Sequence, residues 1–158
     1  MAVSSEELGN TGTLKYPSRI RLPYTGHAGK AGSRFYQEIK DHCKIWGTKC
    51  PRCGWVYVPP RETCPRCFLD IDEWVEVGDA GTLLTYTITR YSVPGIQPHE
   101  PPYALGIIKL DGAGSGLVHL LGEIEPEDIR VGMRVQAVFR EVREGNYLDI
   151  EYFKPLRS

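Results

Sequence analysis

The second half of the chain alternates apolar and polar residues in short runs, which is typical of β-strands. Residues 82–92 form the longest run and are rich in Thr, Tyr and Ile. Further strands are predicted at 104–110, 117–124, 135–142 and 147–153. The glycine-rich segment 111–116 predicts a hairpin turn, and the proline-rich segment 94–102 predicts a loop. A single helical turn is predicted over 125–130, before the last pair of strands. Five or so short strands separated by glycines favour a small closed barrel of the OB type, with a β-sandwich as the alternative.

Two Cys-x-x-Cys turns precede this region, and they are the strongest chemical signal in the chain. Cys50 and Cys53 form the first pair, and Cys64 and Cys67 form the second, with residues 54–63 between them. Four thiolates surround Zn²⁺ as a tetrahedron and leave no coordination position for water, so such a site is structural. Two redox dithiols are the alternative, but these normally lie within a βαβ unit, which the pattern does not contain. The spacing therefore predicts one bound zinc ion.

The residues around the cysteines predict a zinc ribbon. Residues 45–49 lead into the first turn as a strand, and 55–58 return from it. Two prolines end the returning strand because neither can donate a backbone hydrogen bond. Residues 72–77 alternate around Trp74 and begin the strand-rich half. We therefore divide the chain into an extended arm or disordered tail (1–32), a helix plus zinc ribbon (33–70) and an OB-fold barrel (71–158).

A short amphipathic helix is predicted over residues 34–43, with Ser33 as its N-cap. Phe35 and Ile39 lie four residues apart and form an apolar stripe that Tyr36 borders. A zinc ribbon is too small to bury such a stripe well. We therefore expect Phe35, Tyr36 and Ile39 to contact a partner protein, although packing on the chain's own core is the common alternative.

Composition and charge narrow the class of protein. The chain has 158 residues and a net charge of −1, which argues against a protein that coats nucleic acid. No apolar run approaches the length of a membrane span, and residues 1–10 lack the apolar core of a signal peptide. Free thiols and a zinc site suit a reducing compartment, so we expect a cytoplasmic protein.

No catalytic motif is visible. The four histidines lie in no recognisable nucleophile or metal motif, and Cys43 is the single cysteine outside the two pairs. Arginines cluster around the cysteines at Arg52, Arg61 and Arg66. Their positive charge compensates a four-thiolate zinc site, which is the interpretation we favour; phosphate recognition is the alternative.

With these features together, the chain resembles a known family. The resemblance covers about residues 33–155 and rests on the cysteine pairs, Val58-Pro59-Pro60-Arg61 between them, and the later motifs 74–78, 81–83, 86–87, 102–105 and 131–135. It is similar to the rubredoxin-like zinc ribbon plus OB-fold proteins that accompany thiolases and related acyl-CoA enzymes.

The resemblance implies a non-catalytic accessory subunit that binds Zn²⁺ through the four paired cysteines. Its partner would be a thiolase-fold protein that supplies the catalytic cysteine and histidines. The chain would support assembly and contribute to binding the CoA ester, with Arg52, Arg61 and Arg66 as candidate contacts to CoA phosphates. The family's reactions include archaeal mevalonate synthesis, retro-aldol cleavage of sterol side-chain CoA thioesters and the thiolytic step of anaerobic aromatic degradation. The last is our working expectation, although the sequence does not choose among them. The alternative from another class is a zinc-ribbon/OB module that binds nucleic acid.

Overall fold

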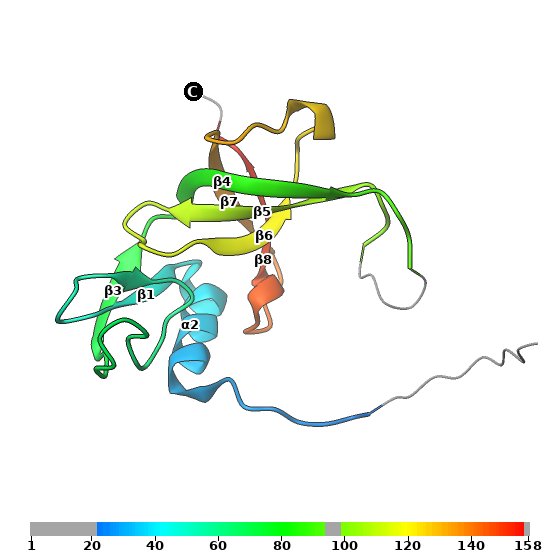
Figure 1. The fold of residues 1–158 in the computed structure, drawn as a ribbon. Coiled ribbons are helices and arrows are strands. Elements are labelled where there is room, and N and C mark those ends of the chain that lie inside the picture. Colours follow the sequence, from blue (N-terminus) through cyan, green and yellow to red (C-terminus); the bar gives the residue numbers. More distant parts are fainter. Residues whose placement is uncertain (1–21, 94–98, 157–158) are drawn as a thin grey trace, which may run out of the picture.

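The computed structural model describes residues 22–93 and 99–156, which form two sheets and one α-helix (Figure 1). Residues 1–21 of the predicted N-terminal arm and residues 94–98 of the predicted proline-rich loop lie outside these ranges. The ribbon half contains α2 (Gly29–His42), β1 (Ile45–Lys49), β2 (Val56–Tyr57) and β3 (Glu73–Val77). The barrel half contains β4 (Ala80–Thr89), β5 (Tyr103–Leu110), β6 (Leu117–Leu121), η1 (Pro126–Asp128), β7 (Arg134–Phe139), η2 (Tyr147–Asp149) and β8 (Ile150–Pro155).

The predicted barrel is confirmed. Its strands close in the order β4-β5-β6-β8-β7, and β4 completes the ring by pairing with β7. β6 and β8 run parallel and meet at Leu121 and Phe153, whereas the other neighbouring strands are antiparallel. β5 shows the alternation that specified this fold, because Ala104, Ile108 and Leu110 are buried and Ile107 and Lys109 are exposed.

The strand predicted from the alternation around Trp74 forms, but it belongs to the ribbon. β3 pairs with β1 along its whole length, in a three-stranded sheet of order β2-β1-β3. Only Gly78 and Asp79 separate β3 from the first barrel strand. The alternation identified a strand correctly, but it carried no information about the neighbour with which that strand would pair.

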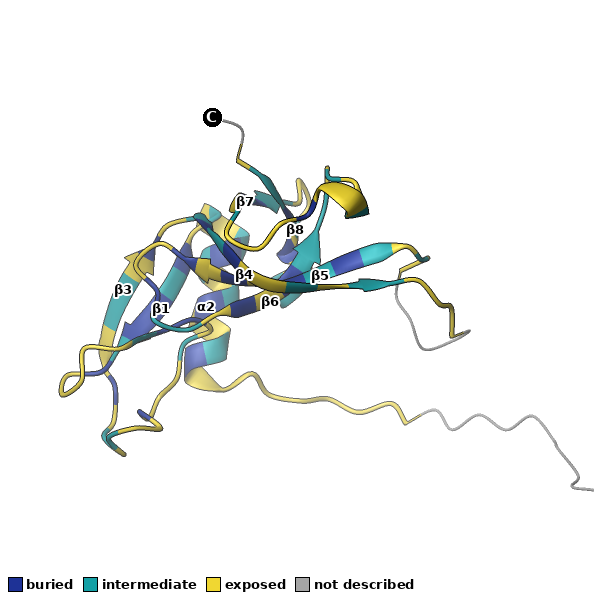
Figure 2. Cartoon of the chain, turned by 45° about the horizontal axis from the view of Figure 1, so that its top comes forward, coloured by how far each residue is buried: buried dark blue, intermediate teal, exposed yellow. Residues whose placement is uncertain are grey.

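The structure corrects the prediction for the helix. It begins at Gly29 rather than after Ser33, and the residue before it, Ala28, makes no side-chain cap hydrogen bond. Phe35 and Ile39 are 1% and 0% exposed and lie in the same apolar cluster as barrel residues such as Phe153. Figure 2 shows the buried side of α2 turned toward the strands. The stripe is therefore not a free surface, because ribbon and barrel together bury what the ribbon alone could not.

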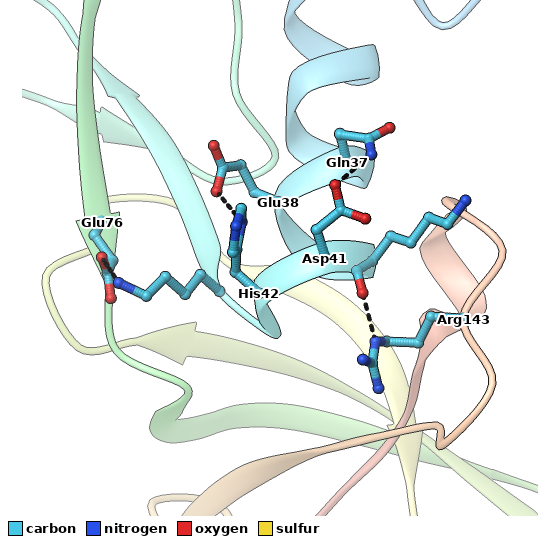
Figure 3. A network of polar contacts seen from close by, with 8 residues as sticks. Gln37, Glu38, Asp41, His42, Glu76 and Arg143 are labelled. Carbon is cyan, nitrogen blue, oxygen red and sulfur yellow. Dashed lines mark hydrogen bonds and ion pairs between the residues drawn. The ribbon is translucent and has the colours of Figure 1, made fainter.

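Both ends of α2 are tied to the rest of the chain. Near its N-terminus, the Ala31 N–H donates to the Glu62 carboxylate at 3.1 Å. Near its C-terminus, Arg143 from the barrel half donates through Nε to the Lys40 carbonyl at 2.7 Å (Figure 3). Such a cation at the last turn also interacts favourably with the helix dipole. The helix thus joins the ribbon, through Glu62, to the barrel, through Arg143.

The glycine-rich turn between β5 and β6 fastens the barrel to the ribbon. The Gly114 N–H donates to the Val56 carbonyl at 2.8 Å. The Ser115 hydroxyl accepts from the Val58 N–H at 2.7 Å and donates to the Val58 carbonyl at 2.9 Å. A Cβ at position 114 would lie 2.7 Å from the Trp55 ring, so any larger residue would have to displace that ring. The predicted hairpin turn is therefore also a contact between the two halves.

Among the described residues, no helix has the length and apolar character needed to cross a membrane.

Candidate metal centre

The four predicted cysteine ligands lie together at the tip of the ribbon. All four Sγ atoms are within 4.8 Å of one another. The Cys53 and Cys64 sulfurs are 3.8 Å apart. A tetrahedral site with Zn–S bonds of about 2.3 Å has sulfurs about 3.8 Å apart. The cysteine positions therefore fit a zinc ion with little movement.

The two cysteine turns have matching backbone geometry. In the first, the Gly54 N–H donates to the Cys50 carbonyl at 2.9 Å. In the second, the Phe68 N–H donates to the Cys64 carbonyl at 2.8 Å. The residue that follows each pair adopts a positive φ, 68° at Gly54 and 55° at Phe68. The two turns thus present their sulfurs in the same way, although the residue at positive φ is glycine in the first turn and phenylalanine in the second.

One side of the site is covered by protein and the other is open. Cys50 and Cys64 are completely buried, whereas Cys67 is half-buried and Cys53 is exposed. Tyr57 packs on the buried side in a small apolar cluster with Ile71. The ion would therefore sit near the surface, shielded by the chain from one direction only.

Tyr57 is a functional residue that the sequence analysis missed. Its hydroxyl lies 3.3 Å from the Cys64 sulfur. This hydrogen bond, followed by burial, raises the pKa of Tyr57 to about 12, so the hydroxyl remains a donor at neutral pH. Such outer partners orient and tune metal ligands. Only its position, seven residues before Cys64, hinted at this role, and the sequence alone did not single it out.

Without a metal ion, the protein environment shifts the pKa values of two of the thiols in opposite directions. Burial opposes ionisation of Cys64, but hydrogen bonds from Tyr57 and from the Arg66 and Cys67 backbone outweigh it and lower the pKa of this thiol to about 6. Burial, and then sharing of hydrogen bonds with Cys53, raise the pKa of Cys67 to about 12. Four sulfurs in a closed tetrahedron leave no open position for a substrate, so the site supplies structural rather than Lewis-acid chemistry.

The arginines around the cysteines do not form one cluster with shared contacts. Arg66 lies over the Trp55 ring, 4.9 Å from its centroid. Arg52 and Arg61 are exposed, and none of the three guanidinium groups forms an ion pair with a described carboxylate. The Arg61 backbone is fixed instead, because the buried Thr48 hydroxyl accepts from its N–H at 2.8 Å and donates to its carbonyl at 2.9 Å.

The remaining candidates for chemistry lie apart from the cysteines. Cys43 ends α2 in a left-handed conformation, with φ of 54°, and is half-buried. His119 is buried against Tyr147 and Phe153, and its Nδ1 accepts from the Leu120 N–H at 2.9 Å. Among the described residues, no hydrogen bond joins a histidine to a serine, threonine or cysteine side chain. The described residues therefore show no histidine hydrogen-bonded to such a nucleophile.

Comparison with known proteins agrees with this architecture. A family model described as the rubredoxin-like zinc ribbon domain of ChsH2 matches residues 38–70, and one described as the C-terminal OB-fold domain of ChsH2 matches residues 74–140. The site is thus a zinc ribbon, and Zn²⁺ is the metal that its four cysteines bind.

Curated and solved relatives narrow the assignment. A DUF35 domain-containing scaffold protein of Methanocaldococcus jannaschii is 32% identical over 130 residues, covering 79% of this chain and 91% of the relative. A scaffold protein of the same description from Pyrococcus furiosus is 31% identical over 112 residues, covering 71% of this chain and 80% of the relative. A solved structure titled Ltp2-ChsH2(DUF35) aldolase matches with a TM-score of 0.57 and 26% identity, covering 78% of this chain and 93% of that chain. The chain belongs to the DUF35 family.

Proposed function

We propose that this chain is a non-catalytic scaffold subunit of an enzyme complex that acts on acyl-CoA thioesters. A thiolase-fold partner supplies the catalytic cysteine and histidines in this proposal. The main support is the similarity to DUF35 scaffold proteins over nearly the whole length of the M. jannaschii relative. The zinc site agrees with such a role, because its cysteines are occupied as ligands and not available as nucleophiles.

Two reactions fit a partner of this kind. The first is thiolytic C–C cleavage, or the reverse condensation, as in anaerobic aromatic degradation; the family resemblance supports it. The second is retro-aldol cleavage of an acyl-CoA, which is favoured by the similarity to the structure titled as an aldolase. In both, this chain assembles the complex and the partner carries out the chemistry.

The groove between ribbon and barrel is our candidate site for part of the CoA ester. It has a volume of about 320 Å³ and is lined by Val58, Pro59, Pro60, Arg61, Ser115 and Gly116. Arg61 is exposed there and has no described ion-pair partner, so its guanidinium is available for a phosphate. Arg52 and Arg66 extend the positive charge on the ribbon.

Affinity purification of the tagged full-length chain from its own cells tests the scaffold role. We expect a thiolase-fold or aldolase subunit to co-elute and to be identified by mass spectrometry. Acyl-CoA cleavage should then require that subunit, and adding this chain should increase it. Cleavage by the isolated chain would contradict the proposal, and Cys43→Ala would show whether the free thiol is responsible.

Arg61→Ala tests the groove separately. This variant should raise the KM for the CoA ester in the reconstituted complex without changing co-elution, and Arg61→Lys should restore part of the effect because the positive charge returns. An unchanged KM for both variants would remove the groove from the proposal and leave the scaffold role intact.

A further inference from the structure

The matching cysteine turns of the ribbon differ in the residue that follows each cysteine pair. After the first pair, Gly54 adopts a φ of 68°, which glycine does without steric cost. After the second pair, Phe68 adopts a φ of 55°, where the Cβ of an L-residue crowds the following carbonyl. For a bulky side chain this is a genuine outlier. The second turn therefore carries strain that the first avoids.

The Phe68 ring does not offset this strain by burial. It is 82% exposed, so it adds little to the apolar core of the free chain. The turn holds the backbone in this conformation, because the Phe68 N–H donates to the Cys64 carbonyl at 2.8 Å. It does not account for the exposed phenylalanine ring, since glycine adopts the same conformation in the first turn without strain. Strained backbone positions cluster at functional sites, so the exposed ring is a candidate contact.

The surroundings of Phe68 resemble the energetic centre of a protein interface. Arg66 lies two residues before Phe68, and its guanidinium is held over the Trp55 ring. Trp55 is itself 38% exposed. Aromatic residues and arginine dominate the binding energy of interfaces. The exposed Cys53 sulfur lies at the same zinc site, so a surface that covered this tip would also shield the open side of the metal.

The charge near the tip favours a protein over a polyanion. Acidic and basic side chains balance over the two cysteine turns and their flanks: residues 49–73 contain Lys49, Arg52, Arg61 and Arg66 against Glu62, Asp70, Asp72 and Glu73. Nucleic acid is the less suitable partner for such a surface, since its binding depends on an excess of positive charge. A folded protein with one apolar pocket and a rim of mixed charge fits it.

We infer that Phe68 anchors the zinc ribbon in an apolar pocket of the partner enzyme, with Arg66 and Trp55 at the edge of the contact. This inference rests on the proposed function, because the partner is the thiolase-fold or aldolase subunit of that complex. It moves the partner contact away from the buried helix stripe, to the end of the ribbon that carries the cysteine turns.

Two substitutions separate the ring from the backbone strain. Phe68→Gly removes both, whereas Phe68→Ala removes the ring and keeps a Cβ at positive φ. We expect both to weaken binding of the purified partner subunit at least tenfold in calorimetric titration. The free Phe68→Gly chain should keep its zinc, and its Tm should be unchanged or higher by a few degrees, because glycine tolerates this φ. Val142→Ala, at a barrel-half residue that is 80% exposed, is the control and should change neither quantity.

Zinc release gives an independent readout. Transfer of zinc from the wild-type chain to a chromogenic chelator should slow when the partner subunit is bound, and this protection should be lost in both Phe68 variants. Binding within twofold of wild type for both variants would overturn the inference, as would a Tm lowered by more than about 5 °C in Phe68→Gly. Self-association of the wild-type chain that Phe68→Gly abolishes would overturn it in favour of a second copy. If the wild-type chain binds no such enzyme, the proposed function fails; if it binds and Phe68→Gly has no effect, this inference alone fails.

Discussion

The tip of the ribbon and the rest of the molecule are stabilised by different interactions, a metal site in the first and an apolar core in the second. At the tip, the buried cluster comprises Cys50, Tyr57, Cys64 and Ile71, which is too small to stabilise a fold without a metal. The rest has one continuous apolar core that runs from α2 through the base of the ribbon into the barrel. Ile45, Val58 and Val77 are ribbon residues, yet they belong to that large core. The boundary between metal-dependent and core-dependent stability therefore crosses the ribbon itself.

Removing the metal should show most clearly that the tip and the barrel are stabilised separately. Cys64→Ser takes away a buried ligand, and the free energy lost is the binding energy of a structural zinc, of order 10 kcal/mol at neutral pH. We expect zinc content to fall to near zero and amide hydrogen exchange to become fast over residues 50–72, while the barrel strands stay protected. A ribbon tip that kept its exchange protection without metal would show that the small cluster suffices.

Phe35→Ala should act on the other side of this boundary. The side chain is fully buried in the large core, and such truncations cost about 3–5 kcal/mol. We expect a large drop in the chemical-denaturation midpoint with zinc still bound. Gln37→Ala, at an exposed position of the same helix, is the control and should stay within about 0.5 kcal/mol. If Phe35→Ala left stability unchanged and weakened partner binding instead, the stripe would be a contact surface after all.

Tyr57→Phe tests how much the surroundings of the metal contribute at the tip, because it should lower zinc affinity and leave all four ligands in place. Deleting the hydroxyl removes the hydrogen bond to the Cys64 sulfur and should reduce zinc affinity about 10- to 100-fold. Competition with a chelator of known affinity measures this. Tyr152→Phe removes a barrel hydroxyl that bonds Glu123, and it should leave zinc affinity unchanged. Equal affinities for wild type and Tyr57→Phe would show that the sulfur needs no such donor.

The smallest expected effect is a pH dependence within the barrel. Burial lowers the pKa of His119 below its usual 6.5, so the folded state holds the neutral ring and the unfolded state binds the extra proton. The free energy of unfolding should therefore be fully developed above about pH 6.5 and fall as pH drops below that value. His119→Gln should flatten this part of the profile relative to wild type, measured as Tm between pH 5 and 7.5 with zinc present. Parallel profiles for the two chains would contradict this account.

The sequence predicted those parts that depend on local spacing. The alternation over β4 to β8 specified the barrel strands, because neighbouring side chains on a strand point to opposite faces. The two cysteine pairs specified the metal site, because a Cys-x-x-Cys turn places two sulfurs on one ion. Both features can be recognised within a short stretch of chain.

The features that were missed depend on contacts distant in the sequence. The period of the Phe35–Ile39 stripe is that of any amphipathic helix, and only the placement of Arg143 and the barrel shows what buries it. β3 was recognised as a strand, but its pairing with β1 is not encoded in its own alternation. Phe68 was not singled out, because nothing near it in the sequence shows whether its ring is buried or exposed in the folded chain.

The two residues that join β3 to β4 limit how far this protein can be treated as modular. Gly78 donates its N–H to the Asp111 carbonyl at 3.1 Å, and the Asp79 carbonyl accepts from the Ala137 N–H at 2.8 Å. The connection is thus hydrogen-bonded to the barrel along both of its residues. The two family matches divide the sequence between residues 70 and 74, but a fragment cut there would separate β3 from the sheet it completes. A transplant of the ribbon into another scaffold would have to carry residues 29–77 and bring replacements for the Gly114–Ser115 turn and for Arg143.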